Sequence, residues 1–322
     1  CDRGGLAEER PRPDAGDSVT RQGGAPTPTP AAKEVPAAAE KEEDAPPPEK
    51  LEDLLAELDS LCGLDKVKRD VKSLINLVKV RKLREEQGLP VPPMSLHLVF
   101  MGNPGTGKTT VARLLSRIYH AIGVLSKGQL VEVDRSGLVA GFVGQTAIKT
   151  SEVIQKALGG VLFIDEAYAL SSHDSANDFG REAIETLLKA MEDHRSDLIV
   201  IVAGYTALMG DFIHANPGLE SRFNKYFYFD DYNGDQLFSI FQSMCEKNGY
   251  TLSVDGLKYC KSYLNSLYET RDENFGNARD VRNLFERAVA RQADRVAGLE
   301  SPTREQLMEL TAEDLNETET LS

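Results

Sequence analysis

Residues 102–109 read GNPGTGKT, the stretch of the chain that is most informative about its fold. It fits the pattern G-x-x-x-x-G-K-[ST], with an apolar run (Leu96 to Met101) before it and a helical stretch (Thr110 to Ala121) after it. The glycines let successive N–H groups point inward at phosphate oxygens, and the following helix adds its positive dipole end. The stretch therefore predicts a loop that binds the phosphates of ATP, made of Gly102, Asn103, Pro104, Gly105, Thr106, Gly107, Lys108, Thr109 and Thr110.

Two side chains of this loop are expected to take part in the chemistry. Lys108 is predicted to reach the β- and γ-phosphates and to act in catalysis, and the Thr109 hydroxyl is predicted to ligate Mg²⁺. The alternative is a glycine-rich turn without a ligand. The strand before the loop and the helix after it disfavour that alternative.

A second motif follows the apolar run Val161 to Ile164, which ends in Asp165 and Glu166. A strand that is apolar throughout is typical of a parallel sheet covered on both faces. Ligands of such sheets bind at the carboxyl ends of the strands, where these two carboxylates are expected to lie. We expect Asp165 to hold Mg²⁺ through water and Glu166 to polarise the water that attacks the γ-phosphate. An acidic turn alone is more often structural, but its pairing with the phosphate loop favours catalysis.

Two arginine motifs lie downstream. The first, NPGLESRF at 216–223, places Arg222 where it can reach the γ-phosphate held by a neighbouring subunit, with a surface salt bridge as the alternative. The second, FGNARDVR at 275–282, starts a helix. Arg279, in its first turn, is expected to touch phosphate, and Arg282 ranks second. Either arginine could instead pair with acidic residues of the body.

A glycine-flanked loop, GFVG at 141–144, carries Phe142 and Val143. The glycines favour mobility over packing, so an exposed ring in this loop is expected to grip peptide by apolar contact. The alternative is a phenylalanine that packs beneath its own loop.

The rest of the chain is predicted to form a tail, a body and a lid. Residues 1–50 hold nine of the fifteen prolines and no aromatic residue, so a disordered or polyproline-like tail is expected. Helical periodicity over 51–89 and then alternating strands and helices predict an α/β body over 51–229. An all-helical lid is predicted over 230–315, before a tail at 316–322. Strands are expected at 129–134, 161–164, 198–203 and 226–229, and lid helices at 235–248, 254–268 and 277–297.

Composition disfavours several classes of protein. The net charge of −14 argues against a general nucleic-acid binder, whose surface would be basic. No apolar stretch approaches the roughly 20 residues of a membrane span. The four cysteines show no C-x-x-C pair, so a reduced cytoplasmic protein is expected. A chain that begins with Cys1 is expected to be a fragment, with a mature lipoprotein as the alternative.

These motifs together resemble one family. Residues from about 51 to 315 are similar to the AAA+ ATPases of the CbbX/CfxQ group in LHLVFMGNPGTGKTTVAR, GLVAGFVGQTAIKT, GGVLFIDEAYAL, DFGREAIETLLKAMED, VIVAGY, NPGLESRF and FGNARDVRN. The resemblance implies an α/β fold, with a P-loop NTPase body whose parallel sheet lies between helices, followed by an all-helical lid. It also implies a hexamer that threads or tugs a protein substrate.

The resemblance assigns roles residue by residue. Lys108 and Thr109 correspond to the Walker A pair, and Asp165 and Glu166 to the Walker B pair. Arg222 corresponds to the arginine finger and Arg279 to the sensor-2 arginine. Phe142 and Val143 correspond to the pore loop, and Gly63, in Cys62-Gly63-Leu64, to a contact with the adenine.

One feature departs from the family pattern. Many AAA+ proteins have Asn or Thr where a strand here ends in Ala203-Gly204-Tyr205-Thr206. Sensor 1 is therefore left unassigned.

The expected function is Mg²⁺-dependent ATP hydrolysis by a ring-forming motor, a homo-oligomer and specifically a hexamer, that remodels or threads a protein client. The alternative is a nucleotide-gated scaffold with little turnover, and the presence of Glu166 and Arg222 argues for turnover. A DNA-directed motor is disfavoured by the negative charge. The client is not identified, and the shared motifs are those of the motor, so Rubisco activation is not inferred.

Overall fold

The computed structural model describes residues 49–316 apart from residue 143, residues 172–178 and residue 274. Residues 1–48 and 317–322 of the two predicted tails, and Val143 of the predicted pore loop, lie outside the described residues. Within the described part, no helix is long and apolar enough to cross a membrane.

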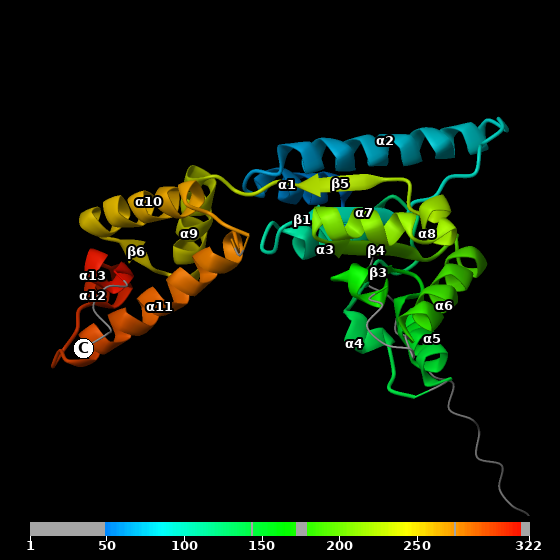
Figure 1. Ribbon diagram of the computed structural model, residues 1–322. Helices are drawn as coiled ribbons and strands as arrows, with labels where there is room; N and C mark the ends of the chain where they lie inside the picture. The colour runs from blue at the N-terminus through cyan, green and yellow to red at the C-terminus, as the bar shows by residue number, and fades with distance from the viewer. Residues whose placement is uncertain (1–48, 143, 172–178, 274, 317–322) are drawn as a thin grey trace, which may run out of the picture. The chain divides into compact units, whose positions relative to one another are not determined.

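A five-stranded parallel sheet forms the centre of the body (Figure 1). Its strands run in the order β2-β3-β4-β1-β5, with bounds Leu98–Gly102 (β1), Leu130–Val133 (β2), Val161–Ile164 (β3), Ile199–Gly204 (β4) and Tyr226–Phe229 (β5). Strands β1, β3 and β4 are buried along their whole length, which explains their unbroken apolar sequence. The predicted fold class is confirmed. The strands predicted at 161–164 and 226–229 match β3 and β5, and those at 129–134 and 198–203 differ from β2 and β4 by one residue at each end. Strand β1 begins two residues after the start of the apolar run 96–101 and ends one residue after it.

Helices cover both faces of the sheet. On one face the core surrounds Phe100, whose ring contacts Phe163, Phe227 and Phe229, beneath α1 (Leu51–Ser60), α2 (Asp65–Glu86) and α3 (Lys108–Ala121). The other face packs against α5 (Gln145–Ala157), α6 (Gly180–Asp193) and α7 (Thr206–His214). Three short elements complete the described body: α4 (Arg135–Leu138), the 3₁₀ helix η1 (Ala167–Ser171) and α8 (Pro217–Arg222).

The lid is built on α9 (Gly234–Asn248), α10 (Val254–Glu269) and α11 (Ala278–Ala297), which share one core. Helix α9 begins with a capping box between Asn233 and Gln236, and the predicted helices differ from the observed ones by one residue at their ends. The sequence prediction missed a parallel pair of strands, β6 (Thr251–Leu252) and β7 (Glu309–Leu310), and the short α12 (Arg304–Met308) and α13 (Ala312–Leu315). Strands of two residues are too short to show an alternating pattern.

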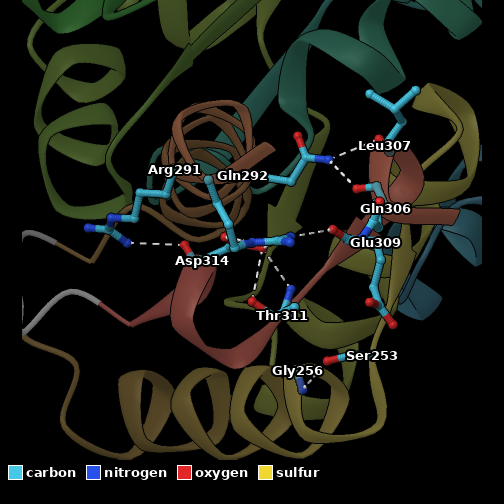
Figure 2. Close-up of polar contacts among 10 residues, drawn as sticks. Ser253, Gly256, Arg291, Gln292, Gln306, Leu307, Glu309, Thr311 and Asp314 are labelled. Carbon is cyan, nitrogen blue, oxygen red and sulfur yellow. Dashed lines mark hydrogen bonds and ion pairs between the residues drawn. The ribbon is translucent and has the colours of Figure 1, made fainter. Parts of the chain in front are cut away.

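The segment 304–316, which we call the C-terminal clasp, is fastened to α11 by polar contacts (Figure 2). Arg295 donates to both carboxylate oxygens of Asp314, at 3.0 and 2.8 Å, and to the carbonyl oxygen of Glu309 at 3.1 Å. Asp314 is 2% exposed and also accepts from the backbone N–H of Thr311 at 2.8 Å. Burial alone would raise the pKa of Asp314, but these hydrogen bonds hold the pKa below its ordinary value.

Two other side chains of α11 bond to the clasp. The Gln292 side chain donates to the carbonyl oxygens of Gln306 and Leu307 at 3.0 and 2.9 Å. Arg291 donates to the carbonyl oxygen of Asp314 at 3.2 Å. The clasp is therefore an integral part of the lid.

Candidate active site

A pocket of about 310 Å³ lies at the carboxyl ends of the strands, between body and lid. The phosphate loop contributes Gly102, Pro104, Gly105, Gly107, Lys108, Thr109 and Thr110. Asp165 and Glu166, which follow β3, and Arg279 and Arg282 of α11 also line it. The structure therefore brings the predicted phosphate loop, the two carboxylates and the lid arginines into one pocket.

The loop between β1 and α3 needs glycine at two positions. Gly105 has a φ of +70° and Gly107 a φ of +93°, which are left-handed conformations that glycine adopts readily. A Cβ atom at Gly105 would lie 2.1 Å from the carbonyl oxygen of Gly276, so the lid approaches the loop too closely for a side chain. Helix α3 begins at Lys108, so its first unpaired N–H groups lie at the pocket, where they suit an anion.

Lys108 is held inside the loop. Its Nζ atom donates to the carbonyl oxygens of Gly102 and Asn103 at 2.8 and 2.7 Å. Burial lowers the pKa of Lys108 to about 8, and the charge of Asp165 partly opposes this effect. A half-buried ammonium whose hydrogen bonds go to neutral carbonyls is well suited to an anionic partner such as phosphate.

The carboxylate pair lies on a turn with an unusual backbone. Glu166 has a φ of +48°, which is uncommon for a residue other than glycine, and such conformations cluster at functional sites. Its backbone N–H donates to Oδ1 of Asp165 at 3.0 Å, and its side chain is exposed. Nearby, the Thr109 hydroxyl lies 3.4 Å from Oε1 of Glu132 on β2. The hydroxyl and the two carboxylates thus lie on elements that meet at the same edge of the sheet.

Three residues predicted to bind ATP are not among the described residues that line the pocket. The Asn103 side chain donates to Oδ1 of Asp231 at 2.9 Å, and the buried Thr106 hydroxyl donates to the Asn103 carbonyl at 2.8 Å. Gly63 lies against α9, where an added Cβ would be 2.7 Å from Nε2 of Gln236. Asn103, Thr106 and Gly63 instead contact Asp231, Tyr232 and Gln236, respectively, which lie in the segment from the end of β5 to the first turn of α9.

Arg222 also lies outside the lining of this pocket. It ends α8, with its side chain 29% exposed and Nη2 3.6 Å from Oε2 of Glu192. Its Nη1 atom donates to the carbonyl oxygen of Gly218 at 3.3 Å. Its Nε atom is buried without a hydrogen-bond partner among the described residues. Arg222, the predicted arginine finger, is therefore only weakly held by contacts within its own subunit.

Phe142, in the loop before α5, is 70% exposed. An exposed ring does not fit the alternative in which Phe142 packs beneath its loop. The loop glycine Gly141 has open space around it.

Sequence reasoning missed several residues at this site. Gly204 and Tyr205, at the end of β4, line the pocket at the position left unassigned as sensor 1. Met244 of α9 and Ala278 of α11 also line it. The absence of the usual Asn or Thr at the end of β4 drew attention to Gly204 and Tyr205, but no sequence pattern indicated Met244.

The fold and this pocket define a nucleotide-binding protein of the P-loop class with a helical lid. The profile of the ATPase family associated with various cellular activities (AAA) matches residues 98–231, and that of the AAA lid domain matches residues 233–321. The chain therefore belongs to the AAA family, and the family resemblance is confirmed.

Individual relatives cover most of the chain. Stage V sporulation protein K of Bacillus subtilis (strain 168) is 42% identical over 267 residues, which is 83% of each chain. Protein CbbX of Cereibacter sphaeroides is 42% identical over 245 residues, 76% of this chain and 79% of its own. The chloroplastic ribulose bisphosphate carboxylase/oxygenase activase of Cyanidioschyzon merolae is 41% identical over 268 residues, 82% of this chain and 91% of its own. The chain is an AAA+ ATPase of the CbbX and Rubisco activase type.

Proposed function

We propose that this ATPase depends on Mg²⁺ and works as a homo-oligomeric ring, a hexamer, that remodels or threads a protein client. The observation that carries the proposal is that Lys108, Asp165, Glu166 and Arg279 line one pocket, whereas Arg222 does not. Such a pocket supplies the parts that position phosphates and water, and Arg279 of the lid, but it lacks the arginine-finger candidate Arg222 that would stabilise the charge of phosphoryl transfer. A ring supplies that arginine from the next subunit.

The pocket residues fit Mg²⁺. The Thr109 hydroxyl and the Asp165 carboxylate both line the pocket, and Mg²⁺ prefers oxygen ligands and retains several waters. When bound, the ion would neutralise charge on the β- and γ-phosphate oxygens. Lys108 then holds the same phosphates, and the exposed Glu166 is available to accept a proton from the attacking water.

Arg222 is proposed to act in trans. Its ion pair with Glu192 is long, at 3.6 Å, and Glu192 is largely exposed, so breaking this contact costs little. Its buried Nε atom has no hydrogen-bond partner among the residues that the structure describes, which supports a side chain that finds its full set of partners on a neighbouring subunit. The isolated subunit should therefore be a poor ATPase.

Phe142 is proposed to grip the client. An exposed ring in a loop can contact an unfolded peptide without reading its sequence, because the contact is apolar. The charge of −14 favours a protein client over nucleic acid, and a protein that needs ATP fits the cytoplasm. The alternative function is a nucleotide-gated scaffold with little turnover.

The test compares wild type with Glu166→Gln and with the matched control Glu152→Gln, which alters an exposed carboxylate on α5. We expect Glu166→Gln to bind ATP but to lose hydrolysis by about 10²- to 10⁴-fold, as for loss of a general base. The control should keep the wild-type rate. Comparable slow rates in all three proteins would favour the scaffold.

The same Glu166→Gln protein should trap its client, because it binds ATP and does not complete the cycle. Material that co-purifies with it in ATP, but not with the Glu152→Gln control, should be protein. Recovery of nucleic acid in its place would overturn the proposed client class.

A further inference from the structure

A buried side-chain amide lies where the lid meets the phosphate loop. Asn277 directly precedes α11 and has no exposed surface. Its φ of +54° is uncommon for a residue other than glycine. A backbone of this kind persists only where the surrounding structure holds it in place.

All three hydrogen-bonding groups of the Asn277 amide are used. The Nδ2 atom donates to Oδ1 of Asp231 at 2.8 Å and to the carbonyl oxygen of Pro104 at 3.3 Å. The Oδ1 atom accepts from the backbone N–H of Tyr232 at 2.9 Å. This one side chain therefore joins the start of α11, the phosphate loop and the segment 230–233 between β5 and α9, which we call the hinge.

Three further hydrogen bonds link the same segments. The backbone N–H of Ala278 donates to the carbonyl oxygen of Gly105 at 3.1 Å. The Tyr232 hydroxyl donates to the carbonyl oxygen of Thr106 at 3.1 Å, and Asn103 donates to Asp231 at 2.9 Å. Each of these bonds has one partner in the phosphate loop. A shift of the loop must therefore stretch or break contacts to the hinge and the lid.

Arg279 follows Asn277 by two residues, in the first turn of α11, and lines the pocket. Its backbone N–H donates to the carbonyl oxygen of Gly276 at 2.9 Å. The position of its guanidinium relative to the loop thus depends on how the residues before α11 are held. Asn277 itself is not among the described residues that line the pocket.

We propose that Asn277 is a positioning residue that couples the phosphate loop to Arg279. Its bond to Pro104 makes the start of α11 follow the loop, and its bonds to Asp231 and Tyr232 fix the hinge about which the lid would turn. Asn277 acts through the loop and Arg279 and does not touch the nucleotide. This inference rests on the proposed contact between Arg279 and phosphate.

The central test is a double-mutant cycle of Asn277→Gly and Arg279→Ala. Glycine adopts a positive φ freely, so Asn277→Gly removes the amide without straining the backbone. We expect each single variant to lower kcat/KM for ATP by about 10- to 100-fold, the range in which misplaced groups act. The double variant should lose little more than the worse single variant, because both remove the same positioning.

A matched control is Asn248→Gly, which removes an exposed lid amide that bonds to the Met244 carbonyl within α9. It should keep wild-type kinetics. Losses that multiply in the double variant would show that Asn277 supports the fold alone, and this would overturn the inference. Melting curves for each protein show the folded fraction at which the rates are measured.

A second pair of variants separates the hinge contacts from the loop contact. Asn277→Asp alone places two carboxylates together, at Asp231 and at the new side chain. Combined with Asp231→Asn, it restores an amide–carboxylate pair at the hinge but sets a carboxylate oxygen against the Pro104 carbonyl. We expect the combination to recover the melting temperature but not kcat/KM. Recovery of both would remove the loop from the coupling and overturn the inference.

Two outcomes distinguish the proposed phosphate contact of Arg279 from the proposed role of Asn277. Wild-type ATP binding and turnover in Arg279→Ala would remove the proposed phosphate contact, and the inference with it. If Arg279→Ala is impaired whereas Asn277→Gly behaves like Asn248→Gly, the proposed function stands and the inference alone fails.

Discussion

Replacing Asp314 by alanine should loosen the C-terminal clasp. Asp314 is 2% exposed and accepts two hydrogen bonds from Arg295 and two from Thr311, one from its backbone N–H and one from its hydroxyl. Removing one partner of a buried ion pair costs about 3 to 5 kcal/mol. The Arg295 side chain is 30% exposed, so its guanidinium regains water when the partner is lost. We therefore expect a smaller cost, of about 2 to 3 kcal/mol.

Hydrogen exchange of the α11 amides measures this loss directly. A cost of about 2 to 3 kcal/mol raises the equilibrium constant for the local opening that exposes the α11 amides by about 30- to 160-fold, since 1.36 kcal/mol is a factor of ten. The matched control is Glu313→Ala, which removes the exposed carboxylate next to Asp314 in α13. Equal acceleration of exchange in both variants would refute the reasoning, because it would assign the effect to charge and not to the buried pair.

The ion pair between Asp314 and Arg295 should also make the stability of the lid depend on pH in strong acid. The pKa of Asp314 is lowered in the folded state, so its contribution is complete above the ordinary carboxylate pKa of about 3.9 and is lost as pH falls through the lowered pKa. The difference in lid stability between wild type and Asp314→Ala should be constant near neutral pH and shrink in strong acid. A difference that grew on acidification would contradict this sign.

Arg222→Ala subunits mixed into wild-type rings should reduce ATP turnover more steeply than dilution, because an arginine finger contributes about 10³- to 10⁵-fold to kcat. A decrease in proportion to dilution would argue against action in trans. Phe142→Ala should retain basal ATPase activity and melting temperature but lose client remodelling, whereas Phe142→Tyr keeps all three, because the ring is 70% exposed. A marked drop in melting temperature would instead indicate packing. Gly105→Ala should abolish binding of a fluorescent ATP analogue, because its Cβ would lie 2.1 Å from the Gly276 carbonyl oxygen; normal binding would show that the lid can withdraw.

The sequence predicted the body and the larger lid helices because their signals are local. The apolar run at 161–164, the glycine-rich loop at 102–109 and the helical periodicity of the lid each lie within one stretch of chain. The orientation of the side chains within the phosphate loop could not be predicted from the loop sequence alone. The Asn103 side chain points to Asp231, which is far away in the sequence, because the two residues form a hydrogen bond.

The contacts of Asn277 could not be predicted from the sequence pattern for the same reason. Asn277 lies in the FGNAR stretch, but nothing in that stretch shows that its amide bonds to Pro104 and to the backbone of Tyr232. Its positive φ is likewise a property of the assembled lid. The proposed roles of Arg222 and Phe142 depend on neighbouring subunits and a client, so they stay predictions.

The pairing of β6 with β7 has a consequence for how the protein is made. Thr251 pairs with Glu309 and Leu252 with Leu310. Strand β6, near the start of the lid, therefore cannot pair until β7, near the end of the lid, has been synthesised. The strands of the body, in contrast, are complete once residue 229 has been synthesised. Since chains fold from the N-terminus as they leave the ribosome, we expect the nucleotide-binding body to form while the lid is still open. Ribosome-bound chains stalled with residue 303 just outside the exit tunnel should resist protease over the body but be cut within α9 and α10, and protection of both regions would contradict this order.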